Sequence, residues 1–157
     1  MITAMDVLDA INLLLVKKYP DRIVYVQQCP KNFARPSFYL ELIRQGTESA
    51  NKGLLAESMY FMLTCFTSKD EYYNSDTLEL IQMQNDILKL FRGGYLGVGD
   101  REIRIEASGG GTDKGEIYID IQVDFAQERS EETEELLYME DVDVKLREEC
   151  ITWDCQV

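Results

Sequence analysis

Residues 116–125 read EIYIDIQVDF, and this stretch decides the fold class. Its apolar residues alternate strictly with polar ones, at Ile117, Ile119, Ile121, Val123 and Phe125. A period of two places the apolar side chains on one face of an extended strand and the polar ones on the other. The stretch therefore predicts a strand with one face in a hydrophobic core.

A second strand precedes it at residues 101–107 (REIRIEA), and the glycine-rich stretch 108–115 (SGGGTDKG) lies between the two. Two strands separated by a glycine-containing turn are typical of an antiparallel hairpin. The glycine run lacks the Lys-Ser/Thr that follows in a phosphate-binding loop, and it joins two strands instead of opening a helix. We therefore interpret it as a hairpin turn.

Three further strands are predicted from β-branched and aromatic runs, at residues 22–27 (RIVYVQ), 37–44 (SFYLELIR) and 54–68 (LLAESMYFMLTCFTS). Residues 45–53 (QGTESANKG) read as a polar turn or flexible loop. The run 54–68 is apolar on both faces, so its second face requires cover from a terminal segment or another subunit. A further alternation at 139–146 (MEDVDVKL) predicts a last strand.

Two helices are predicted, at about residues 3–18 and 76–92, from apolar residues at helical spacing. Each begins with capping-box spacing, and the second ends at Gly93 and Gly94. The order is helix, three strands, helix, hairpin and last strand. We therefore expect an α+β fold, with a mainly antiparallel sheet of about five to six strands and two helices packed on one face.

Charge divides the chain unevenly. The 157 residues carry a net charge of −13, and residues 127–157 hold eleven acidic and three basic residues, or −8 of that total. We expect a single domain at 1–126 and an acidic C-terminal extension at 127–157. A balance this acidic argues against ordinary nucleic-acid binding, which requires clustered Lys and Arg.

Composition also restricts location and chemistry. The four cysteines form no CxxC pair and no run reaches the ~18 apolar residues of a membrane span, so a soluble protein of the reducing cytoplasm is expected, with Cys65 a buried thiol. No histidine is present, which removes the commonest general base and most zinc sites. Paired carboxylates fall on outer strand faces or in the polar run 128–135, where solvated surface is the simplest interpretation. We expect no enzyme activity, no metal and no cofactor.

A basic and aromatic cluster, Lys31, Phe33 and Arg35, follows the first strand. One interpretation is a surface loop with Phe33 tucked into the core. The other is a docking loop for an acidic or apolar partner surface. The residues alone leave both open.

The chain resembles the tail terminator (tail completion) proteins of contractile-tailed phages and phage-like particles of Gram-positive bacteria. The resemblance rests on a helix ending KKYP (17–20), the strand RIVYVQQ (22–28) and the segment KNFARPSFYLELI (31–43), followed by the long strand, helix and hairpin in that family's order. It covers about residues 3–126. The stretch Lys-Asn-Phe-x-Arg-Pro-x-Phe is its most suggestive part.

The resemblance implies a structural protein of the virion or phage-like particle, assembled in the host cytoplasm. Such proteins form a hexameric ring that caps the tail tube protein, stops tube elongation and meets the head–tail connector or collar; the sheath is a further possible partner. In headless particles the ring closes the top. Where a capsid is present, DNA passes the lumen without specific binding, and we hypothesise that the acids of 128–135 line that lumen.

The resemblance also implies where axial contacts lie, namely in the loop 29–36 and the polar loop 45–53. The expected contact residues are Lys31, Phe33, Arg35, Asn51 and Lys52. Replacing Phe33 by Ala, or Arg35 by Glu, is expected to weaken assembly and leave the fold intact.

Three alternatives stay open. A small cytosolic adaptor or immunity-type protein would bind one basic partner through its acidic tail, with steep salt dependence. An enzyme using paired carboxylates would need a cleft that pushes two pKa values apart. Another neck or connector-completion protein would differ little in sequence from a terminator.

Overall fold

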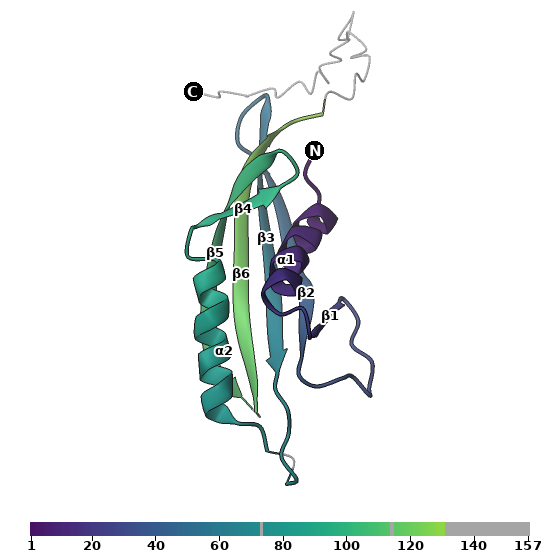
Figure 1. Cartoon of the computed structure of the whole chain (residues 1–157). Helices are drawn as coiled ribbons and strands as arrows, with labels where there is room; N and C mark the ends of the chain where they lie inside the picture. The colour runs from purple at the N-terminus through teal and green to yellow at the C-terminus, as the bar shows by residue number, and fades with distance from the viewer. Residues whose placement is uncertain (73, 114, 131–157) are drawn as a thin grey trace, which may run out of the picture.

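The computed structural model describes residues 1–72, 74–113 and 115–130. Two helices and six strands follow one another along this part of the chain (Figure 1). In order they are α1 (Ala4–Lys18), β1 (Ile23–Val26), β2 (Ser37–Ser49), β3 (Leu54–Phe66), α2 (Thr77–Leu90), β4 (Tyr95–Val98), β5 (Arg101–Asp113) and β6 (Glu116–Glu128).

The strands form one sheet in the order β1-β2-β3-β6-β5-β4. β1 pairs parallel to β2, and the other neighbours pair antiparallel. The four long strands have 13 residues each, which makes them about 40 Å long. Both helices lie against the same face of the sheet (Figure 1). The predicted α+β class, with a mainly antiparallel sheet and two helices on one face, is confirmed.

The core lies between the sheet and the helices. β3 contributes Met59, Phe61, Leu63 and Cys65, and β6 contributes the alternating isoleucines and Val123 that the sequence predicts. Each helix contributes the buried residues on the side that faces the sheet. These are Val7, Leu8, Ile11 and Leu15 of α1 and Leu80, Met83 and Ile87 of α2. The helical and period-two patterns therefore meet in one hydrophobic cluster.

The helix starts follow the predicted capping. The Thr3 side chain accepts a hydrogen bond from the Asp6 backbone N–H, and the Asp6 carboxylate accepts from the Thr3 backbone N–H at 2.7 Å, which completes a capping box. At α2 the Asp76 carboxylate accepts from the backbone N–H groups of Leu78 and Glu79. These bonds satisfy donors that a helix N-terminus leaves unpaired.

The prediction of a turn or loop at residues 45–53 is wrong for most of that segment. β2 continues through Ser49, and Thr47 lies opposite Glu57 of β3, so only residues 50–53 form the turn. The polar composition of 45–49 fits the solvated end of a hairpin, where pairing with β3 supplies the backbone hydrogen bonds. Polarity alone therefore did not distinguish a loop from an exposed strand.

The glycine-rich turn expected at 108–115 is also largely strand. β5 runs through Asp113, with a break in register between Gly109 and Thr112. A Cβ on Gly109 would stand 1.8 Å from the Gln84 side-chain nitrogen of α2. Glycine thus permits close approach of the helix to the sheet here, and the left-handed backbone of Gly115 (φ 78°) belongs to the short turn itself.

The sixth strand differs from the expected one. The residues that follow α2, to which the sequence assigns no strand, form β4. Its Leu96 and Val98 are buried beneath α1. The strand predicted at 139–146 lies outside the described residues. Four residues with two buried side chains are too short for a recognisable period-two pattern.

A buried polar network joins the segment before α1 to strands β2, β3 and β6 of the sheet. The Gln127 side-chain amide donates to the Glu57 carboxylate at 3.1 Å, Thr47 Oγ1 donates to its second oxygen at 2.7 Å, and the Ile2 backbone N–H donates to Gln127 Oε1 at 3.1 Å. Glu57 and Gln127 are each 6% exposed. A buried carboxylate such as that of Glu57 requires hydrogen-bond donors of this kind. Gln127 and Glu128, the first two residues of the expected acidic extension, are the last two residues of β6 and so belong to the sheet.

Cys65 is expected to be chemically inert in the native protein. Its side chain is fully buried, and burial raises the pKa of its thiol to about 12, so the reactive thiolate is absent at pH 8. Iodoacetamide followed by peptide mass spectrometry should leave Cys65 unmodified until urea unfolds the protein. Because the unfolded thiol has an ordinary pKa of 9.0, the thiol also lowers the stability of the fold progressively above pH 9. A Cys65 labelling rate equal in native and unfolded protein would contradict this placement.

Candidate assembly surfaces

The predicted contact residues lie at two opposite ends of the sheet. The loop 29–36 enters β2 at its first residue, whereas the turn 50–53 follows its last. We call these the loop end and the hairpin end, at the bottom and top of Figure 1. The strands between them are about 40 Å long. The sequence predicted both segments as contact sites, and the structure separates them by the full length of β2.

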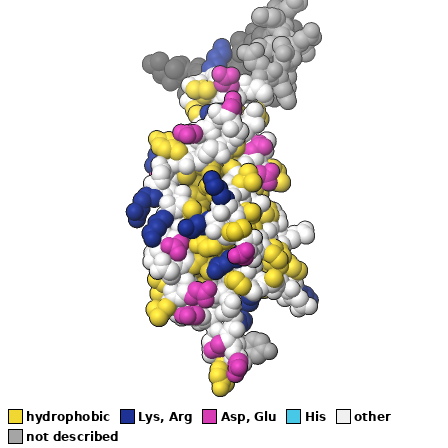
Figure 2. All heavy atoms as spheres, viewed as in Figure 1, with side chains coloured by type: hydrophobic (Ala, Val, Ile, Leu, Met, Phe, Trp, Pro, Cys, Tyr) yellow, Lys and Arg dark blue, Asp and Glu magenta, His cyan; other side chains and the backbone are white. Residues whose placement is uncertain are grey.

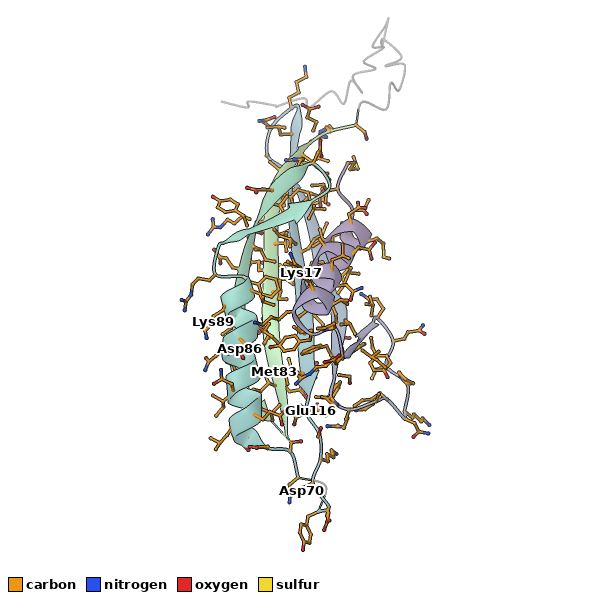
Figure 3. The ribbon with its side chains drawn as sticks, viewed as in Figure 1. Lys17, Asp70, Met83, Asp86, Lys89 and Glu116 are labelled. Carbon is orange, nitrogen blue, oxygen red and sulfur yellow. The ribbon has the colours of Figure 1, made fainter. Side chains whose placement is uncertain are left out.

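At the loop end, Phe33 and Arg35 make contacts within the chain. The Phe33 ring lies 4.4 Å from the ring of Phe66, and the Arg35 guanidinium carbon lies 4.8 Å and 5.0 Å from these two ring centroids. Arg35 also lies 3.7 Å from the Glu116 carboxylate, which Figure 3 shows at this end. The Arg35 guanidinium donates to the Thr67 carbonyl at 3.3 Å. Both side chains thus fasten the loop to the sheet.

The half-buried Phe33 ring packs on Phe66 and does not enter the hydrophobic core between the sheet and the helices. Lys31 is exposed in the same loop. With Lys69, Asp70 and Glu71, the three cluster residues line an open cavity of 570 Å³. Replacing Phe33 or Arg35 must consequently disturb the loop as well as any contact made through it, which revises the expectation of an intact fold.

At the hairpin end, Asn51 shapes the turn. Its side-chain oxygen accepts hydrogen bonds from the backbone N–H groups of Gly53 and Leu54, both at 2.9 Å. Lys52 is exposed at the tip. Arg129, which follows β6, donates through its backbone N–H to the Gly53 carbonyl at 3.0 Å. Of the two expected contact residues here, Asn51 acts inside the turn and Lys52 faces outward.

A third surface is the sheet face turned away from the helices, which we call the open face. The loop 29–36 covers its lower part, where Phe66 is 6% exposed. Its upper part holds a cavity of 570 Å³ lined by residues of β2, β3, β5 and β6, among them Ile43, Arg44, Tyr60, Met62, Glu106 and Asp120. The sequence predicted that this face of 54–68 needs cover, and the loop provides it only in part.

A β-bulge places two residues on the open face that sequence reasoning missed. The register between β2 and β3 shifts between Leu42 and Arg44, so Ile43 is the extra residue and is 54% exposed. Arg44 stands opposite Tyr60, with its guanidinium carbon 4.5 Å from the ring centroid. The adjacent apolar pair Leu42-Ile43 breaks the period of two and was the available signal.

Among residues 1–72, 74–113 and 115–130, no group of three or more His, Cys, Asp or Glu side chains is placed to hold a metal ion. No helix among these residues has the length and apolar character needed to cross a membrane.

Comparison with known families now decides the class. A family model described as phage tail terminator protein matches residues 6–136, which is most of the chain. The chain belongs to the phage tail terminator family. No individual curated protein is significantly similar to it. A tail terminator is a structural protein of the phage tail and acts by contact with other tail components. The loop end, the hairpin end and the open face are the surfaces to consider for such contacts.

Phe33→Ala is expected to destabilise this tail terminator by about 1–3 kcal/mol, because a half-buried ring stacked on Phe66 is lost. Urea unfolding followed by circular dichroism measures the change in unfolding free energy. Lys31→Ala, in the same loop but exposed, is the matched control and should lie within about 0.5 kcal/mol of the parent. Equal unfolding free energies for both variants would show that the ring contributes no packing.

Proposed function

We propose that this tail terminator forms a ring at the top of the tail, caps the tail tube, stops its elongation and presents the interface to the head connector or collar. The family match over residues 6–136 is the observation that carries the proposal. It also favours this role over an adaptor that acts through an acidic tail. The particle is a phage or a headless phage-like particle, assembled in the bacterial cytoplasm.

The geometry supports a protein with two axial contacts. Lys31 is exposed at the loop end and Lys52 at the hairpin end, on either side of strands about 40 Å long. A cap must bind the tube on one side and the connector or collar on the other. Two ends with separate exposed residues allow one copy to make both contacts at once.

Net charge supports passage of DNA through the ring where a capsid is present. Each copy carries −13, and the acidic run begins at Glu128, the last residue of β6. Negative walls repel phosphates and so prevent DNA from adhering. We propose that the acids of 128–135 contribute to such a lumen.

The direct test is negative-stain imaging of the purified protein mixed with growing tubes of the tail tube protein from the same particle. Discrete density at one tube end, together with a halt in growth, is the expected result. Tubes that bear no end density and continue to lengthen would contradict the proposal.

Lys31→Glu and Lys52→Glu are expected to impair different steps, because the two lysines lie at opposite ends. One variant should fail to cap tubes, and the other should cap tubes but fail to join the connector or collar. Tube length distributions and co-sedimentation with the connector measure the two steps. Lys31→Arg and Lys52→Arg, which keep the positive charge at the same positions, are the matched controls and should behave as the parent in both steps. Loss of the same step in both lysine variants would contradict contacts at two ends.

A further inference from the structure

Two surfaces on opposite sides of the sheet carry exposed apolar side chains that the axial contacts do not use. The first is the open face around Ile43, Tyr60 and Met62. The second is the helix face, by which we mean the solvent side of α1, α2 and β4. Because both helices cover the same side of the sheet, these surfaces point in opposite directions (Figure 1).

Acidic groups surround the apolar centre of the open face. Asp120 lies next to Met62 in the register of β6 with β3, and Glu41 lies on the other side of Met62 in β2. Asp120 is exposed, whereas Glu106 of β5, which lines the same cavity, is paired with Arg104 of the same strand. Arg44 is the basic residue among those lining it, and its guanidinium is stacked on Tyr60. The open face is therefore apolar at its centre and acidic at its edge.

The helix face has the opposite charge at its middle. Basic residues occupy the ends of both helices, namely Lys17 and Lys18 in the last turn of α1, Lys89 in that of α2, and Arg92 just after it. The two C-terminal ends approach mid-height from opposite directions, as the labels of Lys17 and Lys89 show in Figure 3. Figure 2 shows blue side chains across this region, with apolar yellow surface between them.

Exposed apolar side chains adjoin these bases. Leu13 is 68% exposed and lines a groove of 520 Å³ between α1 and β4, which is bordered by Lys17 near the end of α1 and by Asp6 and Asp9 near its start. Lysines in a last helical turn are explained by the helix dipole alone. Large apolar side chains this exposed, beside a groove and on a face with partly exposed neighbours, are typical of an interaction surface.

We propose that the helix face of one copy packs on the open face of the next. Lys17 and Lys18 at the end of α1 then meet Asp120 and Glu41, and Leu13 covers the apolar centre around Ile43. A contact between two different surfaces of the same chain is heterologous, so it repeats from copy to copy and closes into a ring at a fixed rotation. The inference rests on the proposed ring and names the faces that hold it together.

Two other occupants of the open face are disfavoured by charge. A second copy packed symmetrically, open face to open face, would bring the acids of the two copies together, and like charges at an interface are repulsive. The segment 131–157 holds ten acidic and two basic residues, so it too would meet acidic groups there. The helix face is the complementary surface, because Lys17 and Lys18 lie beside the exposed Leu13 at the end of α1.

Cysteine cross-linking tests the contact. Leu13→Cys and Ile43→Cys are combined in a background in which Cys29, Cys150 and Cys155 are Ser and the buried Cys65 is kept. A short bismaleimide is added with and without tail tubes, so that a ring that forms only on the tube is also detected. The expected result is a ladder of covalent oligomers from the double variant and none from either single variant.

Charge reversal supplies the second arm. Adding Lys17→Glu or Asp120→Lys alone should reduce the ladder at least several-fold, and adding both to one chain should restore it, because the pair again has opposite signs. Lys69→Glu, exposed at the loop end, is the matched control and should leave the ladder unchanged. Failure of the double reversal to restore cross-linking would overturn the pairing of these two faces.

The outcomes separate this inference from the proposed function. Tubes that are capped without any ladder would keep the cap and overturn the proposed interface. A ladder without capping would keep the interface and overturn the cap, and the absence of both would overturn each. In an Ile43→Cys variant that retains Cys150 and Cys155, a cross-link within one chain to either cysteine would show that the C-terminal segment covers the open face instead.

Discussion

β3 and β6 pair without interruption over thirteen residues, and the other elements take their places from this pair. Phe61 stands opposite Ile121 and Met59 opposite Val123, so the register aligns the apolar sides of both strands on one face. That face alone can bury α1 and α2. A slip of one residue would turn every one of these side chains to the other side and leave the helices without a core. The same register places Met62 beside Asp120 on the open face, so one constraint determines both the core and the proposed interface.

The sequence predicted the parts of the fold that depend on local patterns. The helices, the strand 116–125 and the class follow from periodicity and capping. The missed parts depend on partners far along the chain. Polar residues 45–49 form a strand because β3 pairs with them, and the glycine-rich end of β5 forms a strand because β6 pairs with it. Nothing local marks Glu57 as buried, because its donors Thr47 and Gln127 are supplied by two other strands.

The contact residues show the same division. The sequence left open whether Phe33 packs within the chain or faces a partner, and no local pattern indicates that Arg35 pairs with Glu116, 81 positions away. Of the five residues expected at contacts, Lys31 and Lys52 are exposed, and the other three are engaged within the chain. Our proposals assign different regions to different neighbours: the ends of the long strands to axial partners, and the two broad faces to copies of the same chain.

The measurement that tests this account most directly is a cryo-electron microscopy reconstruction of a capped tail tube. The account predicts one closed ring at a single tube end. In it, the helix face of each copy lies on the open face of the next, and the loop and hairpin ends point in opposite directions along the tube axis. Copies joined through other surfaces, or density spread along the tube instead of at its end, would contradict it.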